Sequence, residues 1–389
     1  MTVLSRQPGA NLYVHVPFCA RKCEYCAFYS EAAAGETVNR YVDSLIRELE
    51  WAAGNPTPRT IFFGGGTPSL LNLRQWEKIL GAMERLDLLG AEEWTVECNP
   101  STVSFEKAAL LRASGVNRIS MGVQSLDERL LDRLGRVHSR EGVFKSFDTL
   151  RRAGFENINL DLMFAIPGQT MEIWRDTLAE TLELGSEHVS CYEVIYEEDT
   201  PLFHQLNAGE FDVDEELACA MYDQLIETVA RAGFRQYEVA NFARSCPDEQ
   251  DEIPVRACRH NVNYWRGGSF YGLGPSATGY LAGQRTKNWS NTILYCEQLE
   301  KGRRAVEWTE QLPPLARAGE TAAFGLRMNA GWPFAQFQQA TGFDLRREWS
   351  TDMDRLAEEG WGCIETDRFR LTERGLRFAD AAAERFLRS

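Results

Sequence analysis

The chain carries the stretch YVHVPFCARKCEYCAF at residues 13–28, where Cys19, Cys23 and Cys26 follow a short apolar run with the spacing C-x3-C-x2-C. Three thiolates so close together can hold three irons of a cubane iron–sulfur cluster, and the fourth iron is then left without a protein ligand. Clusters that only transfer electrons are normally closed by four cysteines. The triplet therefore predicts a cluster with one iron open to a small molecule, much as catalytic zinc sites keep one position open. A trio of buried cysteines, or a zinc site short of one ligand, is the alternative.

The length, charge and cysteine content indicate an acidic globular protein of a reducing compartment. A chain of 389 residues is long for one hydrophobic core and predicts two domains. The net charge of −15 argues against nucleic acid as the main partner. Residues 1–10 lack the apolar segment of a signal peptide, and no stretch reaches the roughly 18 apolar residues of a membrane span. Ten cysteines without a secretory signal then predict a cytoplasmic protein.

The first half of the chain alternates short apolar runs with amphipathic stretches. The expected strands are residues 12–16, 60–63, 94–97, 118–122, 157–163 and 188–193, and the expected helices are residues 38–50, 73–84, 104–113, 140–153 and 171–184. This alternation predicts an α/β fold whose parallel sheet is curled towards a partial, TIM-like (β/α)6 barrel. In such folds the chemistry gathers at the C-terminal ends of the strands, and Cys19, the turn at residues 64–67, Glu97 and Gln124 all stand at such ends.

After about residue 200 the pattern changes. Residues 214–232 predict one long helix and residues 236–239 a strand, while the acidic segment at residues 245–257 contains two prolines and predicts an exposed loop. From about residue 315 the chain is mostly helical, with a hairpin at residues 363–372 and a helix at residues 372–386, an order that resembles a winged helix. We therefore divide the chain into a domain at residues 1–290, with a core at about 11–200 and an extension at about 201–290, and a small helical domain at residues 291–389.

Glycines and polar side chains at the predicted strand ends are candidates for binding a small ligand. The three glycines at residues 64–66 remove every Cβ, so the backbone can approach a polar group closely, although a tight turn also explains one or two of them. Glu97 could accept hydrogen bonds from the hydroxyl groups of a ribose, and the alternative is a solvated strand end. Gln124 and Asp161 are polar groups beside apolar strand stretches, where burial without a partner costs roughly 1–3 kcal/mol. Arg136 can clamp a carboxylate through two hydrogen bonds, or form a surface salt bridge.

The segment HNVNYW at residues 260–265 is the most unusual feature of the second half of the chain. Imidazole is a common ligand of haem iron, and aromatic side chains suit a flat ring system. The alternative is a histidine that satisfies a hydrogen bond of the core, and composition alone favours this alternative for His260, as it does for His15 on the first strand.

Together these motifs resemble radical S-adenosylmethionine (SAM) proteins of the oxygen-independent coproporphyrinogen oxidase group. The shared motifs are the cysteine triplet with Tyr25 inside it, the turn at residues 64–69, ECNP at residues 97–100, MGVQS at residues 121–125 and DLMFAIPG at residues 161–168, and the match runs from about residue 11 to residue 288. The resemblance implies a [4Fe–4S] cluster on the three cysteines, with SAM chelating the fourth iron.

The resemblance also implies roles for individual residues in binding SAM. Tyr13 and Tyr25 would flank the cluster and the adenine, and the segment Gly65, Gly66 and Thr67 would meet the amino group of the methionine part. Glu97 would bind the ribose. A second SAM-like position would involve Gln124, Arg136, Asp161 and Ile195.

Within this group the chain most resembles the haem chaperones. Only 12 residues precede Tyr13, whereas the oxidases of the group carry a longer leading segment; Cys26 is followed by Ala27 and Phe28, where the oxidases have a further cysteine two positions on. The segment at residues 260–265 matches the H-N-x-x-Y-W pattern of the chaperones, which reverses the preference stated above and makes His260 a candidate haem ligand, with the Cys258 thiolate as a second candidate. The loop at residues 245–257 is longer than the family pattern.

The resemblance therefore implies a haem chaperone that binds one haem and transfers it to an acceptor protein. Two alternatives remain: a decarboxylase of coproporphyrinogen III and a radical SAM methyltransferase, so whether the chain is an enzyme stays open. The expected cofactors are the [4Fe–4S] cluster, SAM and haem, and no nucleic acid is expected as a partner. The identity of the acceptor, whether it brings the chain to a membrane, and the oligomeric state stay open.

Overall fold

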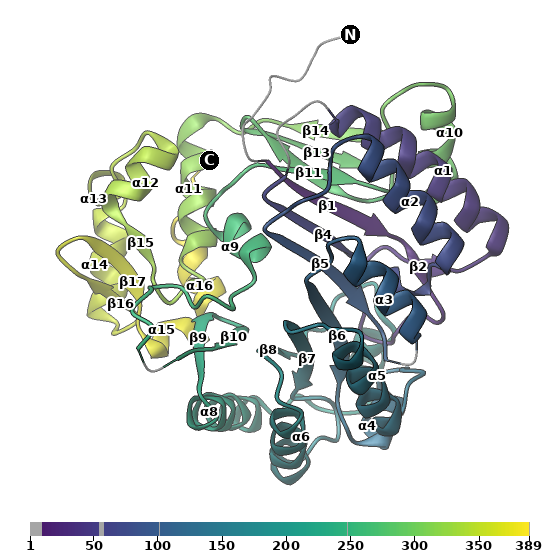
Figure 1. The fold of residues 1–389 in the computed structure, drawn as a ribbon. Helices are drawn as coiled ribbons and strands as arrows, with labels where there is room; N and C mark the ends of the chain where they lie inside the picture. The colour runs from purple at the N-terminus through teal and green to yellow at the C-terminus, as the bar shows by residue number, and fades with distance from the viewer. Residues whose placement is uncertain (1–9, 54–57, 101, 247, 389) are drawn as a thin grey trace.

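The computed structural model describes residues 10–53, 58–100, 102–246 and 248–388, and within them a sheet of twelve strands runs in the order β14-β13-β12-β11-β1-β4-β5-β6-β7-β8-β10-β9 (Figure 1). Its middle consists of six parallel neighbours: β1 (Asn11–Val16), β4 (Thr60–Gly65), β5 (Glu93–Cys98), β6 (Arg118–Gln124), β7 (Ile158–Phe164) and β8 (His188–Glu193). These are the six strands expected from the sequence, which confirms the α/β fold class.

Helices join the six strands and cover the outer face of the sheet (Figure 1). They are α1 (Gly35–Ala52), α2 (Leu73–Arg85), α3 (Phe105–Ala113), α4 (Glu128–Arg133), α5 (Arg140–Arg152) and α6 (Met171–Glu183). A short 3-10 turn, η1 (Pro68–Leu70), follows β4, and the small strands β2 (Phe18–Cys19) and β3 (Glu31–Ala32) pair across the cysteine loop. Side-chain caps begin several of these helices, because Asn72, Ser104 and Ser139 each accept a hydrogen bond from a first-turn amide.

The barrel stays open because each edge of its parallel part continues into other strands. β1 pairs in parallel with β11 (Phe270–Leu273), and β8 pairs antiparallel with β10 (Asn241–Arg244). Beyond them lie β12 (Thr278–Leu281), β13 (Gln284–Asn288) and β14 (Val306–Glu310) on one side and β9 (Phe234–Glu238) on the other. Of these added strands the sequence predicted only β9, since the others are short and lack a clear alternation of apolar residues.

The six parallel strands have one apolar and one polar face. Successive side chains of a strand point to opposite faces, and one set, which includes Val14, Phe63 and Leu162, is fully buried in the main hydrophobic core with the helices. The other set contains Glu97, Asp161 and further polar residues that hydrogen bond to one another inside the barrel. The helices therefore stabilise the barrel from outside, and the polar face is left to line an interior.

The extension also carries helices. α7 (Pro201–Asn207) and α8 (Glu215–Arg231) follow β8, α9 (Arg259–Trp265) precedes β11, and α10 (Thr292–Glu300) lies between β13 and β14 and packs against α1. The described part of the segment at residues 245–257 has neither helix nor strand, as expected, and Glu252 forms an ion pair with Arg368. Pro247, like residues 1–9 of the expected leader, lies outside the described residues.

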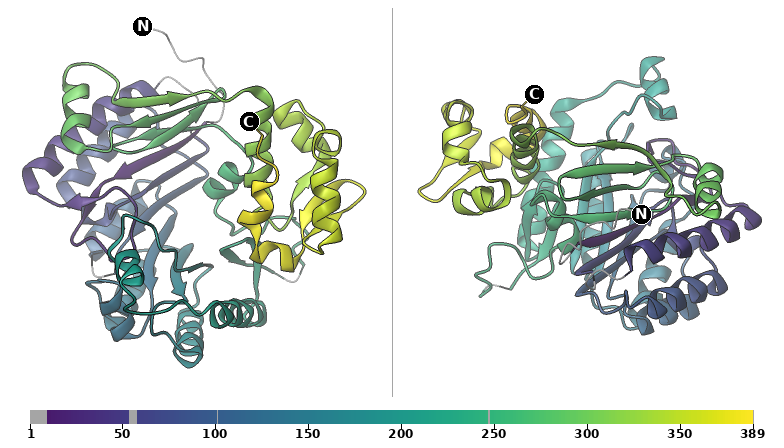
Figure 2. Two further views of the ribbon diagram at one scale, coloured as in Figure 1. Left: turned by 180° about the vertical axis from the view of Figure 1, so that it is seen from behind. Right: turned by 90° about the horizontal axis from the view of Figure 1, so that it is seen from above.

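A second hydrophobic core lies in the C-terminal part of the chain, set to one side of the sheet (Figure 2). Its helices are α11 (Pro314–Gly325), α12 (Phe334–Thr341), α13 (Leu345–Glu348), α14 (Ser350–Glu358), α15 (Glu373–Arg377) and α16 (Ala379–Glu384). A small sheet orders β15 (Trp332–Pro333), β17 (Arg368–Leu371) and β16 (Gly362–Ile364), and β16 and β17 form the expected hairpin.

Two expectations for this region need correction or stay open. The single helix expected at residues 372–386 is wrong, because Phe378 leaves the helical conformation with a ψ of 33° and stacks on Trp361 at 5.0 Å, which separates α15 from α16. The domain boundary at residue 290 stays a prediction, although α10 and β14 pack with the sheet and the second core begins only at Ala318. Within the described residues no helix is both long and apolar enough to cross a membrane.

Candidate cofactor cavity in the barrel

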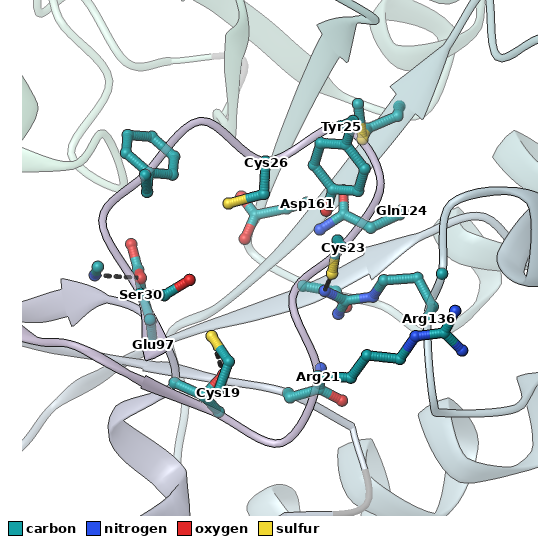
Figure 3. A pocket seen from close by; sticks show the side chains of 18 of the residues that line it. Cys19, Arg21, Cys23, Tyr25, Cys26, Ser30, Glu97, Gln124, Arg136 and Asp161 are labelled. Carbon is teal, nitrogen blue, oxygen red and sulfur yellow. Dashed lines mark hydrogen bonds between the residues drawn. The ribbon is translucent and has the colours of Figure 1, made fainter. Parts of the chain in front are cut away.

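A cavity of about 490 Å³ opens at the C-terminal ends of the parallel strands, on the polar face of the sheet. The cysteine loop forms one of its walls, and Figure 3 shows Cys19, Cys23 and Cys26 grouped with Glu97, Gln124, Asp161 and Arg136 around it. The cavity thus brings together most of the site residues expected from the sequence: Cys19, Cys23, Tyr25, Cys26, Gly65, Gly66, Thr67, Glu97, Gln124, Arg136, Asp161 and Ile195.

The cysteine loop is fixed by backbone hydrogen bonds. The amide of Cys26 donates to the carbonyl of Cys23 at 3.2 Å, and Glu24 bonds through its amide to Leu134 (3.0 Å) and through its carbonyl to Leu202 (2.9 Å). These contacts attach the middle of the loop to the ends of α4 and α7, so the loop is braced by the barrel before any ligand binds.

Two of the three sulfur atoms have donors beside them. The Thr67 hydroxyl donates to Cys19 Sγ at 3.7 Å, and Arg136 Nη1 donates to Cys23 Sγ at 3.5 Å. A hydrogen-bond donor or a guanidinium beside a cysteine sulfur would stabilise the negative charge of a cluster bound there. Burial raises the pKa of Cys26, which disfavours the thiolate in the absence of a metal. Coordination to a metal would overcome this effect, because a metal-bound thiol is deprotonated. This donor set fits a thiolate-bound cluster.

No group of three Cys, His, Asp or Glu side chains in the described ranges converges as the ligand set of one metal ion. A cubane cluster spreads its cysteine ligands over different irons, so the three cysteine sulfur atoms need not converge on one point. The finding is consistent with three sulfur atoms placed around a common space (Figure 3).

The three glycines at the end of β4 and just after it are required by contacts within the protein. A Cβ on Gly64 would lie 2.9 Å from the Glu97 carboxyl, one on Gly65, which has a φ of +101°, would lie 2.4 Å from the His15 ring, and one on Gly66 would lie 2.7 Å from the Val16 carbonyl oxygen. The amides of Gly66 and Thr67 donate to Val16 and Phe18 at 2.8 and 2.7 Å. The backbone of this turn therefore packs directly against the backbone of residues 16–18, which lead into the cysteine loop. The sequence did not show this reason for the glycines.

Two half-buried carboxyl groups face the cavity. Glu97 Oε2 accepts from the Gly65 amide at 3.1 Å, and Asp161 accepts from Ser120 Oγ at 3.0 Å and from Asn159 Nδ2 at 2.7 Å. Burial and the nearby Asp161 raise the pKa of Glu97 to about 8, and burial likewise raises the pKa of Asp161. A cationic ligand would reduce the repulsion between the Glu97 and Asp161 carboxyl groups, and its hydroxyl groups could donate hydrogen bonds to their oxygen atoms.

Gln124 and Arg136 form the opposite side. Gln124 lies at a bulge in the pairing of β6 with β7 and has a φ of +65°, which is strained for a residue with a side chain. Arg136 Nη2 donates to the Gly122 carbonyl at 2.6 Å. Such strain is tolerated where the surrounding structure enforces it, as it often is at binding sites.

The sequence missed some residues of the cavity and placed one in it that lies elsewhere. Cys98, Asn99 and Tyr192 also line the cavity. They follow or end strands, so their position at strand ends was the available signal. Tyr13 was expected beside the cluster, but it does not line this cavity; its hydroxyl lies 3.0 Å from His15 Nδ1, and its ring lies 6.5 Å from that of His260.

His260 lies at the opposite end of the barrel, where it is 1% exposed. Its Nδ1 lies 2.7 Å from Thr60 Oγ1, its Nε2 lies 3.3 Å from the Tyr264 hydroxyl, and its ring packs on Phe62 at 5.1 Å between centroids. Both nitrogens are thus engaged in the interior. Haem ligation by His260 stays a prediction, but this geometry favours the structural alternative.

Cys258 is equally inaccessible. It is 1% exposed, its sulfur lies 3.6 Å from Glu93 Oε1, and burial raises its pKa to about 12. A thiol in this environment is a poor source of thiolate, so its candidacy as a haem ligand has no support from the geometry.

Comparison with known proteins agrees with this cavity. Residues 13–180 match the radical SAM superfamily and residues 312–378 the HemN C-terminal domain. The chain is 34% identical to the heme chaperone HemW of Lactococcus lactis subsp. lactis and 31% identical to that of Escherichia coli, in each case over 98% of both chains. The solved structure of coproporphyrinogen III oxidase (HemN) from Escherichia coli superposes with a TM-score of 0.83 over 98% of this chain and 91% of that one, at 21% identity, a likeness in fold alone.

The contacts of Gly66 predict that an added methyl group destabilises the protein. Gly66→Ala should lower the free energy of unfolding by about 1–3 kcal/mol, because the atoms in its way are backbone oxygens that cannot turn aside. Gly81→Ala is the matched control: it lies within α2, its nearest neighbour is 3.7 Å away, and it should gain about 0.5–1 kcal/mol. Equal unfolding free energies for the two variants in denaturant titrations would contradict the packing described.

A second prediction concerns His260. His260→Ala should cost about 2–4 kcal/mol at pH 7, since it removes a buried ring and its hydrogen bonds, whereas exposed His204→Ala should change stability by less than about 0.5 kcal/mol. Burial and Arg118 lower the pKa of His260 to about 3. Between these pH values the unfolded chain binds a proton at His260 and the folded chain does not, so wild-type stability is lost as the pH falls from about 6.5 towards 3. The difference in the free energy of unfolding between wild type and His260→Ala should therefore become smaller over that range. A difference that becomes larger would refute the buried neutral ring.

Proposed function

The chain belongs to the HemW family of radical SAM proteins, and we propose that it is a haem chaperone that binds one haem and passes it to an acceptor protein. The observation that carries this proposal is the identity of 34% and 31% with two heme chaperones over 98% of each chain. The cytoplasm, expected from the sequence, is the compartment in which we place this activity. The acceptor is unidentified.

The barrel cavity is the proposed site of a [4Fe–4S] cluster and SAM. Cys19, Cys23 and Cys26 would hold the cluster, supported by the donors from Thr67 and Arg136. When bound, such a cluster supplies an iron with an open coordination position and one electron at a time.

The remaining lining residues have separate proposed tasks. Glu97 would accept hydrogen bonds from the SAM ribose and balance the sulfonium charge, because its half-buried carboxyl group faces the cavity. Residues 65–67 would orient the amino group of the methionine part of SAM, with Tyr25 nearby. The second SAM-like position would be formed by Gln124, Arg136, Asp161 and Ile195. Tyr13, which the sequence placed beside the cluster and the adenine, lies outside this lining.

The cysteine triplet predicts the iron content directly. Anaerobic reconstitution should give about four irons per chain, and the triple variant Cys19→Ala/Cys23→Ala/Cys26→Ala should retain none above background. Replacing the exposed Cys219 and Cys246 with Ala is the control and should leave iron content unchanged. SAM should also change the spectrum of the cluster. Normal reconstitution of the triple variant would place the cluster elsewhere.

Titration with haemin tests the function. We expect a stable Soret band that saturates at one haem per chain, with no decarboxylation of coproporphyrinogen III when SAM and a reductant are present. Turnover of that porphyrinogen would instead make the chain an oxidase, and accumulation of S-adenosylhomocysteine would make it a methyltransferase. The triple cysteine variant separates haem binding from any reaction that needs the cluster and SAM, because haem binding should survive the loss of the cluster.

A further inference from the structure

A second cavity, of about 480 Å³, lies outside the barrel interior, between the end of α9, the strands β11–β13 and the helix α11. Within the described residues its lining and that of the cluster cavity have no member in common. The residues that line it are Tyr264, Trp265, Gly267, Gly268, Phe270, Thr278, Tyr280, Arg285, Glu320, Thr321 and Phe324.

Aromatic side chains from four elements form most of the walls. Tyr264 meets Phe270 edge to face at 4.3 Å between ring centroids, Phe270 lies 6.4 Å from Tyr280, and Trp265 lies 6.5 Å from Phe324. A concave, mostly apolar site of 300–1,000 Å³ with a few polar groups is typical of pockets for small molecules and cofactors. These walls suit a flat, largely apolar ring system.

Glycines bring the walls close together. A Cβ on Gly267 would lie 2.9 Å from Thr321 of α11, and one on Gly268 would lie 2.0 Å from the Asn263 side chain. Both glycines directly follow α9, so its C-terminal end can pack tightly on α11 while Tyr264 and Trp265 line the cavity.

The helix α9 therefore has two different ends. His260, near its start, is sealed inside the barrel, whereas Tyr264 and Trp265, at its end, line this cavity. The segment at residues 260–265 thus supplies aromatic walls to the second cavity, while its histidine is buried in the barrel interior.

A few polar side chains line the cavity, among them Tyr280, Arg285 and Glu320. Arg285 forms ion pairs with Glu310 and Glu320. Tyr280 makes no side-chain hydrogen bond among the residues that the structure describes. Burial and Glu320 raise the pKa of its hydroxyl, whereas Arg317 and Arg285 act in the opposite direction. A tyrosine oxygen is an established ligand of haem iron, and metal coordination would displace its proton, so the cavity offers one oxygen donor.

We propose that this second cavity holds the haem, with the ring system between the aromatic walls and the Tyr280 oxygen as the ligand of its iron. The proposal rests on the function proposed above and assigns that function a location. The cluster cavity is less suitable for the apolar ring system of haem, because the carboxyl groups of Glu97 and Asp161 and the three cysteines line its walls.

Haemin titration of three variants tests the location. Phe324→Glu places a charge in the apolar wall at a side chain that is 42% exposed, so the fold should tolerate it. It should weaken haem binding roughly tenfold or more. Phe105→Glu is the matched control, since Phe105 is 44% exposed on α3, and it should bind as the wild type does. Tyr280→Phe should change the position of the Soret band. Iron–sulfur content and the circular dichroism spectrum verify the fold of each variant.

The outcomes separate the location from the function. If the wild type gives no Soret band, both the chaperone function and this site are wrong. If the wild type binds haem and neither Phe324→Glu nor Tyr280→Phe differs from it, the function stands and the location is overturned. Phe28→Glu probes the competing place, because Phe28 lines the cluster cavity and is 69% exposed. Loss of binding in Phe28→Glu together with normal binding in Phe324→Glu would move the haem to that cavity.

Discussion

The Glu93 carboxylate at the start of β5 binds the helix α9 at the N-terminal ends of the barrel strands, opposite the cluster cavity. It accepts from the amides of Arg259 and His260 at 3.0 Å each, the first amides of α9, which have no partner within the helix. A buried carboxylate is costly unless its acceptor atoms are used, and here both oxygens have donors. This interaction places His260 inside the barrel and the aromatic end of α9 outside it. A wall of the second cavity therefore depends on this carboxylate.

A chain of hydrogen bonds connects the cluster cavity to that helix. Asp161 bonds to Asn159 (2.7 Å), Asn159 to the His188 ring (2.6 Å), and His188 to the Tyr237 hydroxyl (2.9 Å), which accepts from the Cys258 amide (3.1 Å). All of these groups lie on the polar face of the barrel or against it. Because an unpaired polar group is costly in such surroundings, the chain keeps the interior in one arrangement. A ligand that changes the charge of Asp161 acts at one end of this chain, and α9 lies at the other.

Local patterns in the sequence predicted the parts that depend on neighbours along the chain. The alternation of strands and helices, the cysteine triplet and the strand-end residues such as Glu97 follow from periodicity and spacing, and the structure brings them to one cavity. Other features depend on contacts between distant segments. His260 meets Thr60, 200 positions away, and Gly65 is needed because of His15 on another strand. Neither contact leaves a local signature, so the sequence did not show these structural reasons for His260 and Gly65, whose roles toward haem and SAM stay predictions. The short strands β11–β14 were missed for the same reason, since pairing with β1 stabilises their position.

The central claim is that one chain holds a cluster with SAM and a haem at the same time, in two cavities whose described lining residues have no member in common. Electron paramagnetic resonance of the reduced, reconstituted protein measures this directly, with zinc protoporphyrin as a diamagnetic substitute for haem. SAM should change the signal of the cluster, and one equivalent of the porphyrin, bound as judged by its fluorescence, should leave the SAM-dependent signal in place. Reversal of the SAM-dependent change by the porphyrin, or release of the porphyrin by SAM, would mean that the two compete for one cavity and would contradict the account.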